Sequence, residues 1–211
     1  MKLDKSKFKN IRNIPKRIRL QDHYHLSTII AENSVTVVKM NDNLLPLDST
    51  KYVKTLLINI SNRKEITDPH FSKIYNEQFP IYSGITFTSA SVGSDYLFAN
   101  DIARDCDMII LAAYFSVRND INGKSLSDLQ INFIDELLKL NKKVIIISFE
   151  NPYILSLFPQ AENYICTFSN SKVSQRAALD LLNGSIQPKG RLPISIPKTE
   201  YRIGYKWKPN I

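Results

Sequence analysis

Short apolar runs alternate with amphipathic stretches along most of the chain. Continuous apolar runs are typical of strands that are buried on both faces of a sheet, and the most apolar of them lies at 107–115. Apolar residues at helical spacing between these runs predict amphipathic helices. In chain order, the pattern predicts helices at 22–34, 68–79, 94–106, 125–141 and 171–184, and strands at 35–40, 53–60, 84–90, 107–115, 142–149, 163–168 and 191–196.

The alternation of strand and helix occurs at the spacing of βαβ units. It predicts an α/β fold in which five to six of these strands form an open, mostly parallel sheet with helices on both faces, a layered αβα sandwich. Asp68 and Ser94 are predicted to cap the second and third helices, and Gly184 to follow the fifth in a left-handed conformation. Ligands of such folds bind beyond the C-terminal ends of the strands. This rule points to the loops at 89–94, 115–123, 148–153 and 169–172.

Composition and charge add little to this prediction. A chain of 211 residues favours one domain, and no apolar run approaches the roughly 20 residues that a membrane-spanning helix needs. Without such a helix or a signal peptide, the default expectation is a cytoplasmic protein. The net charge is +8, of which residues 1–20 carry +7. We therefore predict a basic lead segment or linker at 1–20 and the α/β domain at 21–211, and we favour the linker over an arm that binds nucleic acid or anionic lipid.

The common catalytic and cofactor motifs are missing from the sequence. It has no GxGxxG, no GxxxxGK[ST] and no GxSxG, so we expect no cofactor. The turn "SVGSD" has one glycine, and a helix cap at Ser94 is a better interpretation of it than an anion site. His23 and His25 lie two residues apart, which is not the spacing of metal ligands on one helical face, and no metal is expected. Cys106 and Cys166 are expected to be buried and reduced.

Two acidic residues follow neighbouring predicted strands. Asp120 lies in the loop after 107–115, and Glu150 lies in the loop after 142–149. A pair of carboxylates at neighbouring strand ends is the arrangement that hydrolases use, but a solvated Asp and a Glu in a turn are the more common explanation. Arg118 can pair with Asp120, and such an exposed pair contributes little to stability.

The stretch "LLNGSIQPKGRLPISIP" near the end of the chain resembles the closing motif of the C-terminal α/β sandwich domain of glycoside hydrolase family 3. Further pieces resemble that domain in the same order: "HLSTIIAENSVTVVKMNDNLLPL", "CDMIILAAY", "VIIISFENPYIL" and "SNSKVSQRAALDLLNG". The resemblance covers roughly residues 21–205. The "SFxNPY" form is most similar to the bacterial β-N-acetylglucosaminidase branch.

The resemblance implies a glycosidase whose nucleophilic Asp lies on a barrel ahead of this domain. A barrel takes about 250 residues, so we expect the present chain to lack it and to be non-catalytic alone. Some relatives carry an acid/base Glu in the loop that corresponds to "FSVRNDINGKSLSDLQ", which contains no Glu here. We therefore assign no catalytic residue. The expected partner is a barrel domain or chain, and the expected ligand is a β-linked N-acetylglucosaminide. The side chains expected to face the sugar pocket are Arg118, Asn119, Asp120 and Asn151.

Two alternatives remain open at this point. The first alternative to a glycosidase domain is a binding module that uses its basic lead segment on nucleic acid or an anionic surface, and the second is an inert product of a split gene. The first alternative predicts an affinity that falls steeply with salt and depends on residues 1–20. Sugar specificity and oligomeric state do not follow from the sequence.

Overall fold

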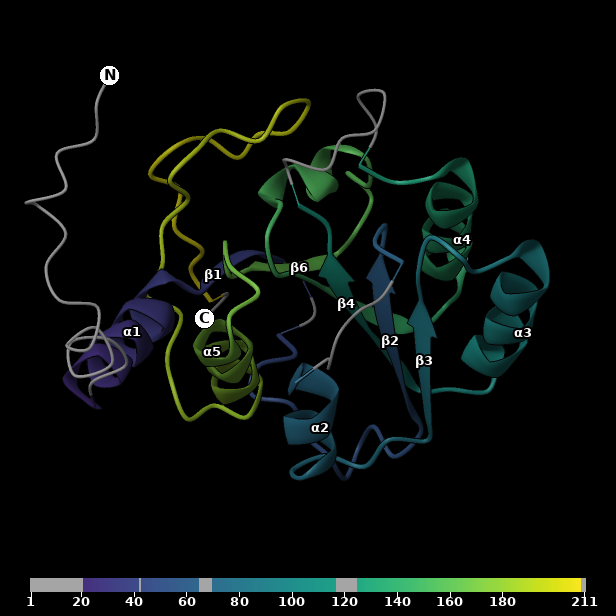
Figure 1. Cartoon of the computed structure of the whole chain (residues 1–211), viewed down its shortest axis with the longest axis horizontal. Helices are drawn as coiled ribbons and strands as arrows, with labels where there is room; N and C mark the ends of the chain where they lie inside the picture. The colour runs from purple at the N-terminus through teal and green to yellow at the C-terminus, as the bar shows by residue number, and fades with distance from the viewer. Residues whose placement is uncertain (1–20, 42, 65–69, 117–124, 210–211) are drawn as a thin grey trace, which may run out of the picture.

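The computed structural model describes residues 21–41, 43–64, 70–116 and 125–209 (Figure 1). Helices and strands alternate along these residues, as the sequence predicts. Their bounds are α1 (Gln21–Ser34), β1 (Thr36–Met40), β2 (Thr55–Ser61), α2 (His70–Asn76), β3 (Ser83–Phe87), α3 (Gly93–Arg104), β4 (Met108–Tyr114), α4 (Asp128–Lys139), β5 (Lys143–Ser148), the short 3-10 helix η4 (Pro152–Ser156), β6 (Asn163–Cys166) and α5 (Lys172–Leu182).

The described strands form one six-stranded sheet in the order β1-β6-β5-β4-β2-β3. All neighbouring strands from β6 to β3 pair in parallel. Only β1 runs antiparallel, along the outer edge of β6, with Thr36 opposite Cys166 and Met40 opposite Asn163. The prediction of an open, mostly parallel sheet of five to six strands is confirmed.

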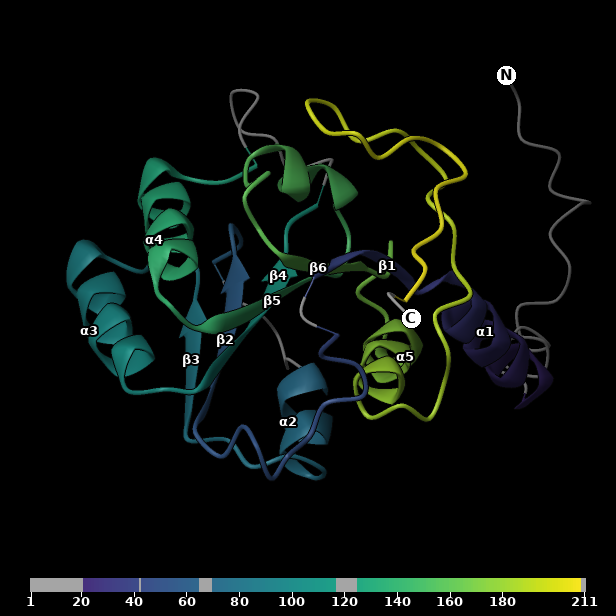
Figure 2. The ribbon, with the colours of Figure 1, turned by 180° about the vertical axis from the view of Figure 1, so that it is seen from behind.

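Strand β4 lies in the middle of the sheet and is buried along its whole length. Its side chains alternate between the two faces. Ile109 and Leu111 enter the hydrophobic core that α3 and α4 cover, whereas Ile110 and Ala112 enter the core that α2 and α5 cover. Helix α1 packs beside α5 (Figures 1 and 2). The predicted three layers, with helices on both faces, are therefore confirmed.

Two predicted helix ends are settled by the structure. Gly184 follows the last turn of α5 with φ +79°, as predicted, because a residue without Cβ adopts this conformation freely. The predicted Ser94 cap is wrong. Helix α3 begins at Gly93, Val92 occupies the cap position, and the Asp95 carboxylate accepts a hydrogen bond of 2.9 Å from the Val92 N–H. Asp68 lies outside the described residues.

The predicted closing strand at 191–196 is also wrong. Leu192 and Ile196 are buried, as the apolar alternation suggested. However, this segment forms no regular strand, and its main chain bonds to the residues that follow it: Leu192 N–H donates to the Tyr205 oxygen at 2.9 Å. Pro193 has no N–H to donate to a sheet ladder. The edge beside β6 is already occupied by β1.

The two glycines of the closing stretch each lie against the start of the domain. A Cβ on Gly184 would lie 2.8 Å from the Pro46 side chain. A Cβ on Gly190 would lie 2.5 Å from the main-chain oxygen of Val35 and 2.6 Å from that of Ser34. Close contact therefore requires both glycines, in addition to local turn geometry: Gly184 lies against the connection after β1, and Gly190 lies against the junction of α1 and β1.

Both cysteines are free and fully buried, as predicted. Burial raises the pKa of the Cys166 thiol far above its usual value and also raises that of Cys106. Both side chains act as small apolar groups of the core.

We predict that Gly190→Ala lowers the free energy of unfolding by about 3 kcal/mol, because rigid main-chain atoms leave no room for the methyl group. Gly93→Ala is the matched control. It meets nothing within 4 Å, and at the first position of α3 it changes stability by less than about 1 kcal/mol. Urea denaturation followed by circular dichroism measures both. Equal stability of the two variants would contradict the close-contact explanation.

Candidate functional site

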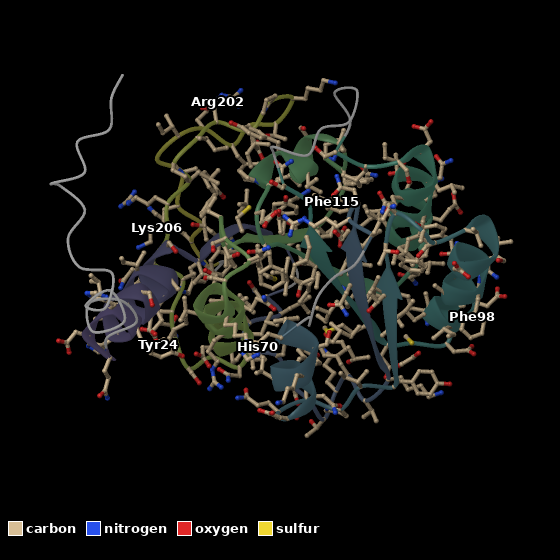
Figure 3. All side chains as sticks on the ribbon, in the orientation of Figure 1. Tyr24, His70, Phe98, Phe115, Arg202 and Lys206 are labelled. Atoms are coloured by element: carbon tan, nitrogen blue, oxygen red, sulfur yellow. The ribbon has the colours of Figure 1, made fainter. Side chains whose placement is uncertain are left out.

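Polar residues gather where the parallel strands end. Asn62 follows β2, Glu150 follows β5, and three residues follow β3: Thr88, Ser89 and Ser91. From β2 the chain continues to the neighbouring strand β3, whereas from β4 it continues to β5, which lies in the opposite direction along the sheet. The switch in strand order therefore falls between β2 and β4. A crevice at such a switch point is the usual ligand site of open α/β sheets. At this edge, Phe115 directly follows β4 and is buried (Figure 3).

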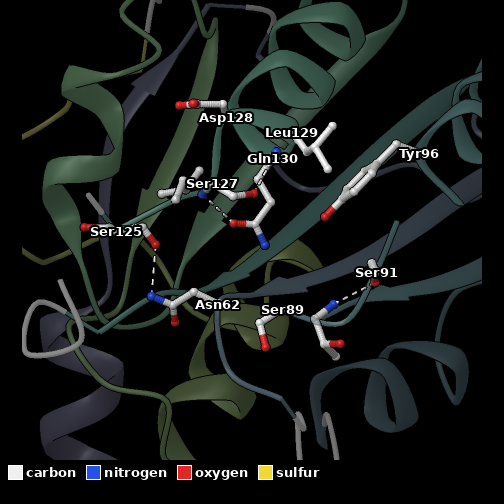
Figure 4. A pocket seen from close by; sticks show the side chains of 11 residues that line it. Asn62, Ser89, Ser91, Tyr96, Ser125, Ser127, Asp128, Leu129 and Gln130 are labelled. Atoms are coloured by element: carbon white, nitrogen blue, oxygen red, sulfur yellow. Dashed lines mark hydrogen bonds between the residues drawn. The ribbon is translucent and has the colours of Figure 1, made fainter. Parts of the chain in front are cut away.

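A cleft of about 580 Å³ lies at this edge, between the end of β2, the loop after β3 and the first turn of α4 (Figure 4). Its volume falls within the roughly 300–1,000 Å³ range of small-molecule sites. Most of its described lining side chains carry a hydroxyl or an amide. The described lining residues are Asn62, Thr88, Ser89, Ser91, Tyr96, Ser125, Leu126, Ser127, Asp128, Leu129 and Gln130.

Hydrogen bonds fix the wall that α4 contributes. The buried Gln130 side chain donates from Nε2 to the Ser61 main-chain oxygen at 2.9 Å. Its Oε1 accepts from the Ser127 N–H at 3.0 Å, which forms a capping box at the start of α4. The Asn62 amide donates to the Ser125 main-chain oxygen at 3.0 Å, so the end of β2 is tied to the segment before α4. These bonds hold the cleft in shape without a ligand.

The opposite wall comes from the β3–α3 connection. Ser91 Oγ accepts a hydrogen bond of 3.0 Å from the Thr88 N–H. Tyr96 stacks on Phe87, with ring centroids 4.3 Å apart, and is 6% exposed. Burial raises the pKa of the Tyr96 phenol, against the opposing effect of a hydrogen bond with Gln130. The phenol is therefore neutral near neutral pH.

An ion pair crosses the same edge of the sheet. One guanidinium nitrogen of Arg63, which follows β2, lies 2.9 and 3.1 Å from the two carboxylate oxygens of Glu150, which follows β5. Strand β4 lies between β2 and β5, so the pair bridges its end. The Glu150 side chain is 18% exposed. Glu150 is thus engaged in a structural ion pair, which agrees with the interpretation of a Glu in a turn. Asp120 lies outside the described residues.

The Asn151 side chain is buried and hydrogen-bonded to nearby protein groups. It is 3% exposed, its Oδ1 accepts from the Tyr153 N–H at 2.9 Å, and its Nδ2 donates to Ser125 Oγ at 3.2 Å. It caps η4 and lines a second pocket, of about 210 Å³, together with Leu157. Its predicted contact with a sugar stays a prediction. Arg118, Asn119 and Asp120 lie outside the described residues.

Asn62 and Arg63 are the residues of this edge that sequence reasoning missed. The segment "SNRK" directly follows the strand predicted at 53–60. The rule that ligands bind beyond strand ends therefore applied to it as much as to the four loops that were named. Gln130 was missed for another reason. It lies inside a predicted helix, and its distance from β2 becomes short only in the folded chain.

The described part of the chain shows neither a metal site nor a membrane-spanning helix. It contains no group of three or more His, Cys, Asp or Glu side chains placed to hold a metal ion. No helix in residues 21–41, 43–64, 70–116 or 125–209 is long and apolar enough to cross a membrane.

Comparison with known proteins identifies the family. The model of the glycosyl hydrolase family 3 C-terminal domain matches residues 35–209. The chain belongs to this family. No curated protein sequence matches it.

Solved structures of family 3 enzymes share the fold. A β-N-acetylglucosaminidase from Paenibacillus sp. str. FPU-7 is 18% identical with a TM-score of 0.67, over 88% of this chain and 34% of that one. A β-glucosidase from Listeria innocua is 19% identical with a TM-score of 0.67, over 87% and 28%. The β-glucoside phosphorylase BglX is 22% identical with a TM-score of 0.63, over 85% and 33%. The chain thus spans about a third or less of the length of these enzymes.

We predict that Gln130→Leu lowers the free energy of unfolding by about 2 kcal/mol, because it removes the donor to the buried Ser61 and the acceptor for Ser127. Gln160→Leu is the matched control, since it removes only an exposed hydrogen bond to Asp135 and changes stability by about 0.5 kcal/mol or less. Thermal unfolding of both variants tests this. A Gln130 variant as stable as the control would show that these bonds do not hold the wall.

Proposed function

We propose that this chain is the α/β sandwich domain of a family 3 glycosidase that acts on β-linked N-acetylglucosaminides, and that it is non-catalytic without a barrel that carries the nucleophile. The observation that carries the proposal is the family match over residues 35–209. The polar cleft at the C-terminal edge of the sheet supports it, because hydroxyl and amide side chains suit sugar hydroxyl groups. The relation to an N-acetylglucosaminidase is one of fold.

The described acids of this edge support a non-catalytic role. Glycoside hydrolysis generally needs a pair of carboxyl groups on either side of the scissile bond. Glu150 is bonded to Arg63, which makes it part of the scaffold. Asp128 lies in the first turn of α4 on the rim of the cleft. We therefore expect the barrel, and not these acids, to supply the catalytic carboxyl groups.

The proposed sugar contacts are those that the sequence suggested: Arg118, Asn119, Asp120 and Asn151. Arg118 and Asn151 have donors that suit a sugar hydroxyl or an N-acetyl carbonyl. The described contacts of Asn151 add a second role. Because it bonds to Ser125 and caps η4, it also positions the rim between the two pockets.

The test is the hydrolysis of 4-nitrophenyl N-acetyl-β-glucosaminide by the purified chain, with and without a family 3 barrel domain. We expect release of 4-nitrophenol only in the mixture, because the chain alone lacks the nucleophile. Arg118→Ala should reduce the rate in the mixture by at least about tenfold if its guanidinium binds the sugar. Arg104→Ala is the matched control, since Arg104 lies on the exposed side of α3, paired with Asp101.

Further arms of this experiment separate the alternatives. Hydrolysis by the chain alone would contradict the non-catalytic role. Faster turnover of 4-nitrophenyl β-glucoside would move the specificity to glucosides, and acceleration by inorganic phosphate would indicate phosphorolysis. No activity in any mixture would contradict the glycosidase proposal itself.

We further propose that residues 1–20 are a linker and that residues 21–211 are the folding unit. The match of the family model to residues 35–209 supports this division. Deletion of residues 1–20 should leave the unfolding temperature within about 2 °C of the full chain, because surface changes away from the core alter stability little. Binding to heparin that falls steeply with salt and disappears on deletion would instead favour the nucleic-acid or anionic-surface module.

A further inference from the structure

The last part of the domain, residues 189–208, carries an excess of positive charge. We call these residues the closing arm. Glu200 is its one acidic residue. Its cations are Lys189, Arg191, Lys198, Arg202, Lys206 and Lys208, and all six are exposed. The arm is the yellow part of the chain on the β1 side of the sheet (Figures 1 and 2).

Hydrogen bonds fold the closing arm back on itself. The Leu192 N–H donates to the Tyr205 oxygen, and the Ile196 N–H donates to the Tyr201 oxygen, each at 2.9 Å. The two halves of the arm therefore run side by side. The cations next to Leu192 and those next to Tyr205 are consequently brought to one part of the surface, although they are distant in the sequence.

The positive charge of the arm is not neutralised by the described part of the chain. None of the six cations forms an ion pair with a described carboxylate, and Arg191 and Arg202 donate only to main-chain oxygens of the arm. In contrast, the exposed Arg104 and Arg176 each pair with an aspartate of their own helix. Lys206 and Arg202 lie at the outer edge of the molecule (Figure 3). Such a cluster of unpaired cations attracts a surface or polymer of negative charge.

The apolar side chains of the arm indicate which kind of anionic partner fits. Tyr205 packs on one hydrophobic core, edge-on to Tyr201 with ring centroids 4.9 Å apart, and Trp207 packs on the other core. Rings held against the protein in this way are poor platforms for the bases of a single-stranded nucleic acid. Ile203, however, is 69% exposed, more than any other large apolar side chain of the described residues.

An exposed apolar side chain among cations matches the interface of an anionic bilayer. There, lysine and arginine lie against the phosphate head groups, and apolar side chains enter the boundary with the acyl chains. A nucleic acid offers phosphates for the cations but no comparable apolar layer for Ile203. Charge and exposed apolar surface together therefore favour a lipid surface.

We propose that the closing arm binds the surface of an anionic phospholipid bilayer, with its cations against the head groups and Ile203 at the boundary of the acyl chains. The binding is reversible, because it rests on surface charge and one apolar side chain. The proposal does not depend on the proposed function, since it needs neither a barrel nor the cleft at the strand ends. Each of the two tests can fail without affecting the other.

The experiment is the co-sedimentation of the full chain with vesicles. The anionic vesicles contain phosphatidylcholine and phosphatidylglycerol in a ratio of about 2 to 1, and the neutral vesicles contain phosphatidylcholine alone. We expect half of the protein to bind at about 1 mM accessible anionic lipid at low salt. Binding should fall at least about tenfold when the salt concentration rises from about 0.1 M to about 0.5 M, because salt screens the cations.

A triple substitution tests the cations of the arm. Each lysine near an anionic surface strengthens binding about fivefold, so loss of three should weaken it by at least about tenfold. The arm variant carries Lys189→Gln, Lys206→Gln and Lys208→Gln. The matched control carries Lys51→Gln, Lys54→Gln and Lys73→Gln, which remove the same charge from exposed positions before β2 and on α2, away from the arm (Figure 1). The control should bind within about threefold of the original chain.

A single substitution tests the apolar contact. Ile203→Ser should weaken binding to anionic vesicles about tenfold, because it removes the side chain that enters the boundary. Leu97→Ser is the matched control, since Leu97 is 68% exposed on α3, outside the arm. It should bind as the original chain does.

Three kinds of result would overturn the proposal. The first is no binding to anionic vesicles at low salt, or equal binding to neutral vesicles. The second is equal binding by the two triple variants, which would place the contact elsewhere on the chain. The third is equal binding by Ile203→Ser and Leu97→Ser, or tighter binding of a DNA oligonucleotide than of vesicles. Either finding would define a surface for polyanions in place of one for lipid.

Discussion

The burial of β4 on both faces is the constraint on which the rest of this domain depends. A strand with no solvated face has to be covered by a layer of helices on each side. The two hydrophobic cores meet at its alternating side chains, with α3 and α4 on one face and α2 and α5 on the other. The switch in strand order beside β4 then opens the cleft, because the connections from β2 and β4 leave in opposite directions. The cleft is thus a consequence of the strand order beside the central strand.

Strands and helix ends that are marked by a few adjacent residues were predictable from the sequence. Runs such as "MIILAAY" and the glycine after α5 carry their signal in a few adjacent residues. The cap at Val92 was not predictable from a preference for serine, because the Asp95 side chain supplies the hydrogen bond instead. The segment at 191–196 shows the same limit. Its apolar residues Leu192 and Ile196 alternate because they are buried in the core. Its main chain, however, is hydrogen-bonded to residues 201–205 and not to a strand of the sheet.

The candidate site was less predictable than the fold, since it is made by residues from distant parts of the chain. The Arg63–Glu150 pair and the Gln130–Ser61 bond each join residues more than sixty positions apart. No spacing rule in one sequence reveals such pairs. The family motif is a partial exception. Gly184 and Gly190 contact Pro46 and the Ser34–Val35 main chain, so the resemblance at the two ends of the domain reflects residues that touch.

The antiparallel pairing of β1 has a consequence for the synthesis of the protein. Among the described strands, β1 leaves the ribosome first, yet the strand with which it pairs, β6, begins at residue 163. Until then the backbone groups of β1 that pair with β6 have no partner in the sheet. Gly190, which closes over the α1–β1 segment, is made later still. Until β6 is made, the nascent chain therefore exposes an unpaired strand edge, and such edges promote aggregation.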